Sequence, residues 1–427
     1  MLPALMLARL ASSPLGGGEQ DAATPRAGEV GGPGLALIAA KILSATLDGR
    51  GVVDNAVLLV RDGRIEALGP RRSTEIPAGY EVVDLGARWL MPGMIDLHTH
   101  IGGTGDINDM VFQTNEGLRV STAVVPHNPA IEKDVQAGIT TILFIPGSGT
   151  NIGGQGILLK TGLDTFEQMR LRDPGSLKIA QGDNPTRWGY GMGRAMMNFH
   201  IRTAVRKGLA HARARIQEDD GRPRDTVDIQ YEVFEALVDG STQVSTHTQV
   251  YQLVMNTIRI LKGELGIDVY IDHGEWAAHK LAPFAQRMGV AAICGPRIID
   301  TFESPRSDTD GAILSVPGEY KRKGLERVGF NTDAPVVPGE ELPLQAAMGV
   351  RYGFDASHMD HLRGLTIVPA LVAGIADRVG SLEPGKDADV IVLSGDPADP
   401  RHGIERVYIE GQLVYRAPDG TEGPRLW

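Results

Sequence analysis

Eight short apolar runs recur between residues 92 and 375, and longer stretches of helical character lie between them. The helical stretches include residues 192–218 and 249–265. Alternation of strand and helix favours a parallel sheet, and eight such units favour an α/β fold with a closed (β/α)8 barrel of the TIM type. An open, doubly wound sheet is the alternative. The predicted barrel strands are 94–98, 140–145, 156–161, 177–181, 243–247, 269–273, 291–295 and 328–333.

Short alternating strands dominate both ends of the chain outside this region. Asp62-Gly63 lies between two apolar runs, which predicts a two-residue hairpin because both turn positions need a positive φ. Near the other end, Glu410-Gly411-Gln412 also separates two runs. Neither end has enough strand to bury its own apolar face, so we expect both to join in one small β-sandwich. The predicted organisation is a sandwich of residues 35–91 and 376–427, with the barrel, residues 92–375, inserted between its halves.

Composition narrows the partners and the location that we expect. The 427 residues carry a formal net charge of -11 without a basic run, which is unlike a nucleic-acid-binding protein. No apolar run reaches about 18 residues, so neither a transmembrane helix nor a membrane partner is expected. Cys294 is the single cysteine, which excludes a disulfide framework and a cysteine-based zinc site. Residues 1–34 suggest a poorly ordered tail or a degenerate secretory signal, so cytoplasmic and periplasmic or secreted locations stay open.

Metal-ligating residue types stand where predicted strands end. Residues 92–100 read PGMIDLHTH, and His98 and His100 point to the same side of a strand because they lie two apart. In an eight-stranded barrel, functional residues lie at the carboxyl ends of the strands. Imidazole and carboxylate ligands suit zinc or another first-row divalent ion, whereas surface or capping histidines are the alternative for the pair. The other candidates at strand ends are His247, His273 and Asp333.

These candidates suggest a hydrolytic mechanism. A divalent ion with an open coordination position lowers the pKa of bound water towards ~7 and polarises a carbonyl group. We expect Asp333 to take the proton of that water and to deliver it to the leaving group, with a helix N-cap before Pro335 as the alternative role. Arg297, after the seventh predicted strand, is a candidate for binding a substrate carboxylate, with a surface arginine as the alternative.

Several longer motifs resemble the metal-dependent amidohydrolase superfamily. The PGMIDLHTH motif resembles its first barrel strand, LTIVPALVAGI at 365–375 its last helix, and SLEPGKDADVIVL at 381–393 its return to the sandwich. Three further segments are similar to its imidazolonepropionase-like branch: PGSGTNIGGQGILLKT at 146–161, LKIAQGDNP at 177–185 and IDHGEWAAHKLA at 271–282. Two residues depart from that branch. Ser245 stands where the branch often has a histidine, and Val250 stands where imidazolonepropionases proper have a glutamate.

The resemblance implies a metal-dependent hydrolase of carbon–nitrogen bonds in amides, cyclic amides or peptide-like molecules. The reaction would use a metal-activated water and a small-molecule substrate. The chain could also form a homo-oligomer, and this question stays open. A deaminase or a carboxylic-ester hydrolase on the same fold is one alternative. A catalytically silent scaffold that keeps the barrel is another.

By the same resemblance, the site holds one or two ions. In the two-ion version His98, His100 and Asp333 bind the first ion, His247 and His273 bind the second, and a carboxylated Lys178 bridges them. In the one-ion version Lys178 stays an amine, and His273 polarises the substrate carbonyl. The one-ion ligands would be His98, His100, His247 and Asp333. Lys160 and Asp183 are alternative bridges, and Lys178 as a snorkelling lysine is a further alternative.

Overall fold

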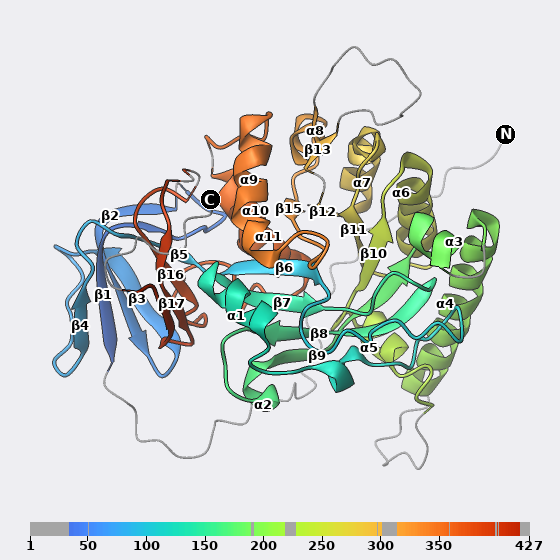
Figure 1. The fold of residues 1–427 in the computed structure, drawn as a ribbon, viewed down its shortest axis with the longest axis horizontal. Coiled ribbons are helices and arrows are strands. Elements are labelled where there is room, and N and C mark those ends of the chain that lie inside the picture. Colours follow the sequence, from blue (N-terminus) through green and yellow to red (C-terminus); the bar gives the residue numbers. More distant parts are fainter. Residues whose placement is uncertain are drawn as a thin grey trace.

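The computed structural model describes residues 34–49, 51–188, 192–217, 228–296, 298–300, 314–357, 359–397, 399 and 401–418. It contains two eight-stranded sheets and a two-stranded one. Figure 1 shows strands from both ends of the chain side by side in one sheet, and the second large sheet beside it with helices around it. Except for residue 34, the tail predicted over residues 1–34 lies outside the described residues.

The first sheet contains both ends of the chain. Its strand order is β18-β17-β16-β5-β1-β2-β3, and β4 also pairs with β1. Strand β5 joins the two ends, because it runs parallel to β1 and antiparallel to β16. Side chains of both ends pack in one core, which includes Leu37, Leu58, Val390 and Val392. The strands are β1 (Leu35–Leu43), β2 (Val52–Arg61), β3 (Arg64–Pro70), β4 (Glu81–Asp84), β5 (Trp89–Pro92), β16 (Val390–Leu393), β17 (Ile404–Ile409) and β18 (Gln412–Arg416).

Two tight turns in this sheet have the positive φ values that the sequence predicts for two-residue hairpins. Asp62 and Gly63 have φ values of 50° and 76°, and they connect β2 to β3. Glu410 and Gly411 have φ values of 48° and 73°, and they connect β17 to β18. Positive φ at both central residues gives a turn whose twist matches that of the paired strands. Both predicted hairpins are therefore confirmed, and with them the small sandwich built from the two ends.

The second sheet is the barrel, and each of the eight predicted strands corresponds to one of its strands. Their order around the sheet follows the sequence from β6 to β15. The barrel closes where Thr99 forms a parallel bridge to Ala334 and the His100 N–H donates to the Ala334 carbonyl at 2.7 Å. The strands are β6 (Met94–Thr99), β7 (Ile139–Phe144), β8 (Ile152–Lys160), β9 (Arg170–Ala180), β10 (Val244–Thr248), β11 (Val269–His273), β12 (Ala292–Cys294) and β15 (Val328–Phe330).

The direction of β8 corrects the expectation of a parallel sheet throughout. This strand pairs antiparallel with both β7 and β9, whereas the neighbouring pairs β6–β7 and β9–β10 are parallel. The cause is the length of the connections. Residues 145–151 precede β8 and residues 161–169 follow it, and a parallel crossover needs about a dozen residues or more. The chain therefore turns back here as two consecutive hairpins.

Helices cover the outside of the barrel (Figure 1). The predicted helix 192–218 is α4, and the predicted helix 249–265 consists of α6 followed by the π-helix η2. No helix in the described part of the chain is both long and apolar enough to cross a bilayer. The α-helices are α1 (Pro129–Gln136), α2 (Phe166–Met169), α3 (Asp183–Trp188), α4 (Arg194–Gln217), α5 (Val233–Asp239), α6 (Tyr251–Thr257), α7 (Ala282–Met288), α8 (Val316–Arg322), α9 (Leu342–Arg351), α10 (Asp360–Leu365) and α11 (Ile367–Val372).

Short elements complete the connections between these strands and helices. They are η1 (Val120–Ala123), η2 (Ile258–Glu264), η3 (Ala278–Leu281), η4 (Gly339–Glu341), β13 (Ile299–Asp300) and β14 (Leu314–Ser315).

Candidate metal centre

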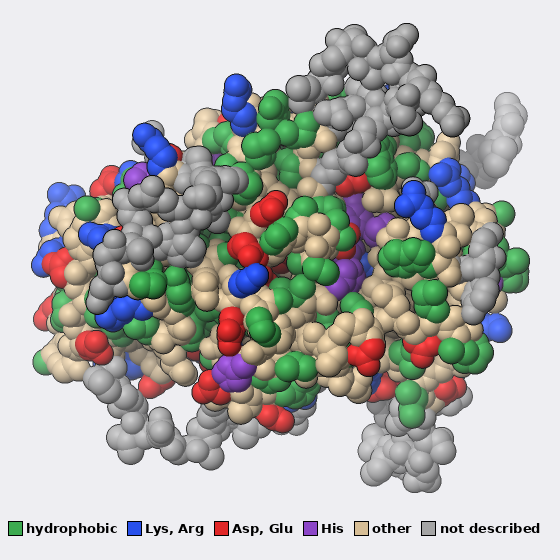
Figure 2. Space-filling view, in the orientation of Figure 1, with side chains coloured by type: hydrophobic (Ala, Val, Ile, Leu, Met, Phe, Trp, Pro, Cys, Tyr) green, Lys and Arg blue, Asp and Glu red, His purple; other side chains and the backbone are tan. Residues whose placement is uncertain are grey.

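Four buried side chains meet where the parallel barrel strands end. Each of His98, His247, His273 and Asp333 offers one ligand atom, and these four atoms lie within 4.8 Å of one another. The side chains come from β6, β10, β11 and the residues after β15, which are far apart in sequence. Figure 2 shows histidine side chains at the bottom of a hollow in this part of the molecule.

The two other predicted metal-site residues border this group. His100 Nε2 lies 3.1 Å from Asp333 Oδ1, and the His98 Nε2 atom lies 3.3 Å from the same oxygen. Lys178 Nζ lies 3.0 Å from His98 Nε2, and the lysine is fully buried. All six residues that the sequence singled out for metal binding therefore lie together, although no comparison tests their individual roles.

Three of the histidines have an acceptor close to Nδ1. The His100 Nδ1 atom lies 2.9 Å from the Ile145 carbonyl, and the His273 Nδ1 atom lies close to the Gly295 carbonyl. His98 Nδ1 lies 3.0 Å from a carboxyl oxygen of Asp272, but the two atoms do not form a hydrogen bond. Because a carbonyl oxygen only accepts hydrogen bonds, a neutral His100 or His273 carries its proton on Nδ1 and has a lone pair on Nε2. These Nε2 atoms then direct a lone pair towards the other side chains of the site, Asp333 at His100 and His247 at His273.

Two residues of the site adopt a left-handed backbone conformation. The φ values are 73° at His273 and 51° at Asp333, and neither residue is a glycine. Such a conformation costs on the order of 1–3 kcal/mol, and it persists only where the surrounding structure determines it. At His273 it interrupts the strand alternation of β11, so that the imidazole joins the group at the end of the barrel.

Burial controls the charge of the site. It lowers the pKa of His273 to about 4 and the pKa values of His98 and His247 well below their usual range. Burial also lowers the pKa of Lys178 to about 8, although Asp272 and Asp333 oppose this shift. Burial alone would raise the pKa of Asp333, but His98 and His100 outweigh it and hold that pKa well below its usual value. Neutral imidazoles around an ionised carboxylate are the protonation states that metal binding requires.

These residues fit a divalent ion. His247 Nε2 is buried without a hydrogen-bond partner, and His247 Nδ1 lies 2.9 Å from His273 Nε2. Imidazole nitrogens and a carboxylate oxygen at this spacing form a donor set suited to first-row divalent metals. The observed cluster supports a divalent metal site.

Lys160, an alternative bridge, lies elsewhere. Its Nζ atom contacts Asp387 at 2.6 Å, Asp389 at 3.2 Å and Glu410 at 3.2 Å, which connects β8 to the sandwich. Because β8 runs antiparallel, its last residue lies at the end of the barrel opposite to the site. Lys160 is therefore not the bridge. The side chain of Asp183 and all of Arg297 lie outside the described residues, so their predicted roles stay predictions.

Two aspartates of the site were missing from the sequence prediction. Asp96 Oδ1 accepts a hydrogen bond from the His98 N–H at 3.0 Å, and Oδ2 accepts one from the Thr332 N–H at 3.2 Å. Asp96 thus connects β6 to the residues that precede Asp333, and burial raises its pKa to about 7. Asp272, described above, contacts His98. Asp272 directly precedes His273, and regular strand alternation would place the two side chains on opposite faces.

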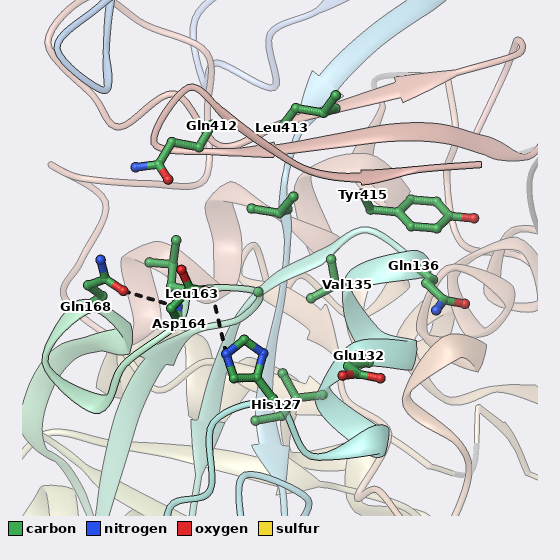
Figure 3. A pocket seen from close by; sticks show the side chains of 13 residues that line it. His127, Glu132, Val135, Gln136, Leu163, Asp164, Gln168, Gln412, Leu413 and Tyr415 are labelled. Atoms are coloured by element: carbon green, nitrogen blue, oxygen red, sulfur yellow. Dashed lines mark hydrogen bonds and ion pairs between the residues drawn. The ribbon is translucent and has the colours of Figure 1, made fainter. Parts of the chain in front are cut away.

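A second hollow of about 470 Å³ lies away from the metal centre (Figure 3). Side chains of α1, of the segment before α2 and of β18 line it, and none of the six predicted metal-site residues is among them. His127 Nε2 and Asp164 Oδ1 form an exposed ion pair of 3.5 Å at this hollow. This hollow is therefore separate from the six residues that the sequence predicts as metal ligands.

Comparisons with known proteins agree with the fold. The profile of the Amidohydrolase family matches residues 232–421. Amidohydrolase tasK of Hapsidospora irregularis is 23% identical over 385 residues, which cover 81% of this chain but 38% of that protein. Imidazolonepropionase of Deinococcus radiodurans is 24% identical over 371 residues, which cover 81% of this chain and 86% of that protein. The solved structure of an amidohydrolase from Thermotoga maritima is 28% identical, with a TM-score of 0.78 and coverage of 90% of this chain and 100% of that one.

Barrel, terminal sandwich and buried His/Asp cluster together define a metal-dependent hydrolase of the barrel type. The comparisons support the amidohydrolase superfamily and, within it, the imidazolonepropionase-like branch. The predicted superfamily, fold class and enzyme class, a hydrolase of carbon–nitrogen bonds, are thereby confirmed. Domain boundaries and the roles of single site residues stay predictions.

Proposed function

We propose that this chain hydrolyses an amide or cyclic amide bond in a small molecule, with zinc or another first-row divalent ion bound at the barrel mouth. The observation that carries this proposal is the convergence of His98, His247, His273 and Asp333 within 4.8 Å. His100 and Lys178 complete the set. The chemistry that a bound divalent ion supplies is activation of a water molecule and polarisation of the carbonyl group.

Asp333 is the residue that we propose for proton transfer. Its Oδ1 atom lies among the predicted ligands, and the residue lies at the open end of the barrel. His98 and His100 keep its pKa low, so the carboxylate is ionised and ready to accept a proton from the attacking water. In the second half of the reaction the same oxygen delivers that proton to the leaving nitrogen.

We favour the two-ion version, because of the hydrogen bonding of His273. The one-ion version requires His273 to donate a proton from Nε2 to the substrate carbonyl. The Gly295 carbonyl lies against Nδ1 and holds the proton there, so that a neutral His273 presents a lone pair instead. This arrangement suits a ligand to a second ion, together with His247. Lys178, whose Nζ lies 3.0 Å from His98 Nε2, is the proposed bridge after addition of carbon dioxide to its amine with loss of a proton.

A substrate screen tests the proposed function. The protein is stripped with a chelator, reloaded separately with zinc and with manganese, and assayed against dipeptides, N-acyl amino acids, small lactams and hydantoin-like rings. Hydrolysis of an amide or ring, restored by metal, is the expected result. Release of ammonia or preference for esters would favour the deaminase or esterase alternatives. Stoichiometric metal without any turnover would favour the silent scaffold.

Imidazolonepropionate is included in the screen because several relatives are named imidazolonepropionases. Val250 directly precedes α6. It occupies the position at which imidazolonepropionases proper have a glutamate. A valine can neither bind the polar part of that substrate nor transfer a proton. We therefore expect no turnover of imidazolonepropionate, and turnover at the rate of the best amide in the screen would contradict this part of the proposal.

A further inference from the structure

A group of hydrogen bonds around the backbone of Asp333 has no part in the proposed reaction. Asp333 follows β15 and has a φ of 51°, which a residue other than glycine adopts only where the surrounding structure determines it. Its side chain lies beside His98 and His100. The hydrogen bonds near its backbone involve Thr332 and Ala334, the residues on either side of it.

Thr332 is completely buried and makes three hydrogen bonds. Its N–H and its hydroxyl both donate to Asp96 Oδ2, at 3.2 Å and 2.5 Å. The same hydroxyl oxygen accepts a hydrogen bond from the Ala334 N–H at 3.1 Å. The other carboxyl oxygen of Asp96, Oδ1, accepts one from the His98 N–H at 3.0 Å. One buried carboxyl group thus connects the backbone at His98 with the backbone that leads to Asp333.

These hydrogen bonds take the place of a strand ladder where the barrel closes. Strands β6 and β15 are the two ends of the sheet order, and an isolated bridge between Thr99 and Ala334 joins them in the described part of the chain. Because β15 ends at Phe330, the N–H groups that follow need acceptors outside its ladder. Asp96 and the Thr332 hydroxyl supply acceptors for two of these groups.

The Thr332 hydroxyl is the centre of this arrangement, because it acts as a donor and as an acceptor. Without it, the Ala334 N–H loses its acceptor and Asp96 loses one of its donors. The Ala334 carbonyl in turn accepts a hydrogen bond from the His100 N–H at 2.7 Å. Loss of the hydroxyl would therefore loosen the backbone on both sides of Asp333, close to its contact with His100.

We propose that Thr332 is a positioning residue that, together with Asp96, holds the backbone of Asp333 so that its carboxylate faces the metal centre. The inference rests on the proposed function, in which Asp333 is a metal ligand and the proton-transfer group. Its first consequence concerns the metal-free protein, where residues 332–334 are already held. Its second consequence is a higher affinity for zinc, because a ligand that is fixed before binding loses less conformational freedom.

The test uses the full-length protein at pH 8, above the pKa of about 7 to which burial raises Asp96. Thr332→Val keeps the shape of the side chain and removes the hydroxyl, whereas Thr332→Ser keeps the hydroxyl. Thr161→Val is the matched control: Thr161 is also buried, and its hydroxyl donates to the Ile139 carbonyl at 2.6 Å at the opposite end of the barrel. Zinc affinity is measured by competition with a chromophoric chelator. Hydrogen exchange of the metal-free protein is measured by mass spectrometry over residues 94–100 and 328–336.

We expect Thr332→Val to bind zinc about 10- to 100-fold more weakly than the unchanged protein, and Thr332→Ser and Thr161→Val to stay within about threefold of it. Exchange over residues 328–336 should be faster in metal-free Thr332→Val and unchanged in the other two variants. Zinc affinity of a folded Thr332→Val within about twofold of the unchanged protein would overturn the inference. An equal loss of affinity in Thr332→Ser would also overturn it, because the effect would then belong to the methyl group.

Asp96→Asn decides the question if Thr332→Val does not fold. Its amide offers a donor in place of one acceptor, so one end of the connection is lost and exchange should be faster over residues 94–100 or 328–336 of the metal-free protein. Unchanged exchange over both segments overturns the inference. Failure of the unchanged protein to bind zinc would refute the proposed function, whereas exchange of the metal-free variants would still decide whether Thr332 holds this backbone.

Discussion

At the scale of single residues, three histidines of the metal centre each have an oxygen atom close to Nδ1. The Ile145 and Gly295 carbonyls accept hydrogen bonds from Nδ1 of His100 and of His273. Asp272 lies 3.0 Å from His98 Nδ1 without forming a hydrogen bond. The residue pattern predicted the ligand candidates, because strand ends and residue types are visible in a sequence. It could not predict their partners, since two of the three are main-chain carbonyls and the third, Asp272, depends on where the strand alternation breaks.

Replacement of Asp333 with asparagine tests its role in proton transfer. The amide cannot accept the proton of the water, so kcat should fall by about 10²- to 10⁴-fold while the fold is kept. Kinetics on the best substrate and thermal unfolding monitored by circular dichroism measure the two effects. Asp164→Asn, in the exposed ion pair with His127, is the control and should leave kcat unchanged. Equal kcat values for Asp333→Asn and the unchanged protein would remove Asp333 from the mechanism.

Replacement of Lys178 with methionine tests the number of ions. Methionine fills the buried space but cannot carry the bridging carboxylate, so the variant should bind one ion where the unchanged protein binds two. Metal analysis of protein purified in the presence of bicarbonate gives the stoichiometry. Lys262→Met, which removes a partly exposed lysine, is the control and should retain two ions. A single ion in fully active, unchanged protein would refute the bridged arrangement.

At the scale of elements, the sequence correctly predicted the positions of the barrel strands. It did not predict that β8 runs antiparallel to its neighbours. Apolar runs and turn residues mark where each strand lies, so all eight were found. Direction depends on the connections, and a parallel sheet throughout would require crossover connections both before and after β8. The short connections of 145–151 and 161–169 could have revealed the two hairpins.

The close packing of β8 against β9 gives a prediction at this scale. A Cβ atom at Gly175 would lie 2.6 Å from the Leu158 backbone nitrogen and 2.8 Å from the Ile157 carbonyl carbon. Because backbone cannot move aside easily, Gly175→Ala should lower the free energy of unfolding by about 1–3 kcal/mol. Urea unfolding measures this change. Gly105→Ala is the control, since a Cβ there meets nothing within 4 Å, and it should change stability by less than ~0.5 kcal/mol. Equal effects of the two substitutions would contradict the prediction.

At the scale of the whole molecule, a buried ion cluster joins the barrel to the sandwich. Lys160 ends β8 and contacts Asp387, Asp389 and Glu410, which belong to the C-terminal part of the chain. Arg378 also binds Asp387, at 2.7 Å. The sequence analysis names Lys160 as an alternative bridge between two ions. Its true environment is set by the reversed direction of β8, which a pattern of apolar residues does not report.

Loss of the Lys160 charge should destabilise this connection. Lys160→Met removes the buried cation that all three carboxylates share and leaves Arg378 beside Asp387 and Glu410 only, so the free energy of unfolding should fall by about 3–5 kcal/mol. Thermal and urea unfolding of the metal-free protein measure the loss. Lys262→Met removes the partly exposed ion pair with Asp268 and should cost no more than about 1 kcal/mol. A smaller loss for Lys160→Met than for this control would show that the buried cluster does not hold the two parts together.

Strand β5 has a consequence for how such a chain matures. One of its edges pairs with β1 and the other pairs with β16. Strand β16 is synthesised only after the entire barrel, so the second edge of β5 stays unpaired until then. Until then the ribosome-bound chain exposes an unpaired, apolar strand edge, which is an opportunity for association with other nascent chains. The last-made strands therefore act as the closing step of folding, and a chain stalled before residue 390 would present that edge to chaperones and proteases.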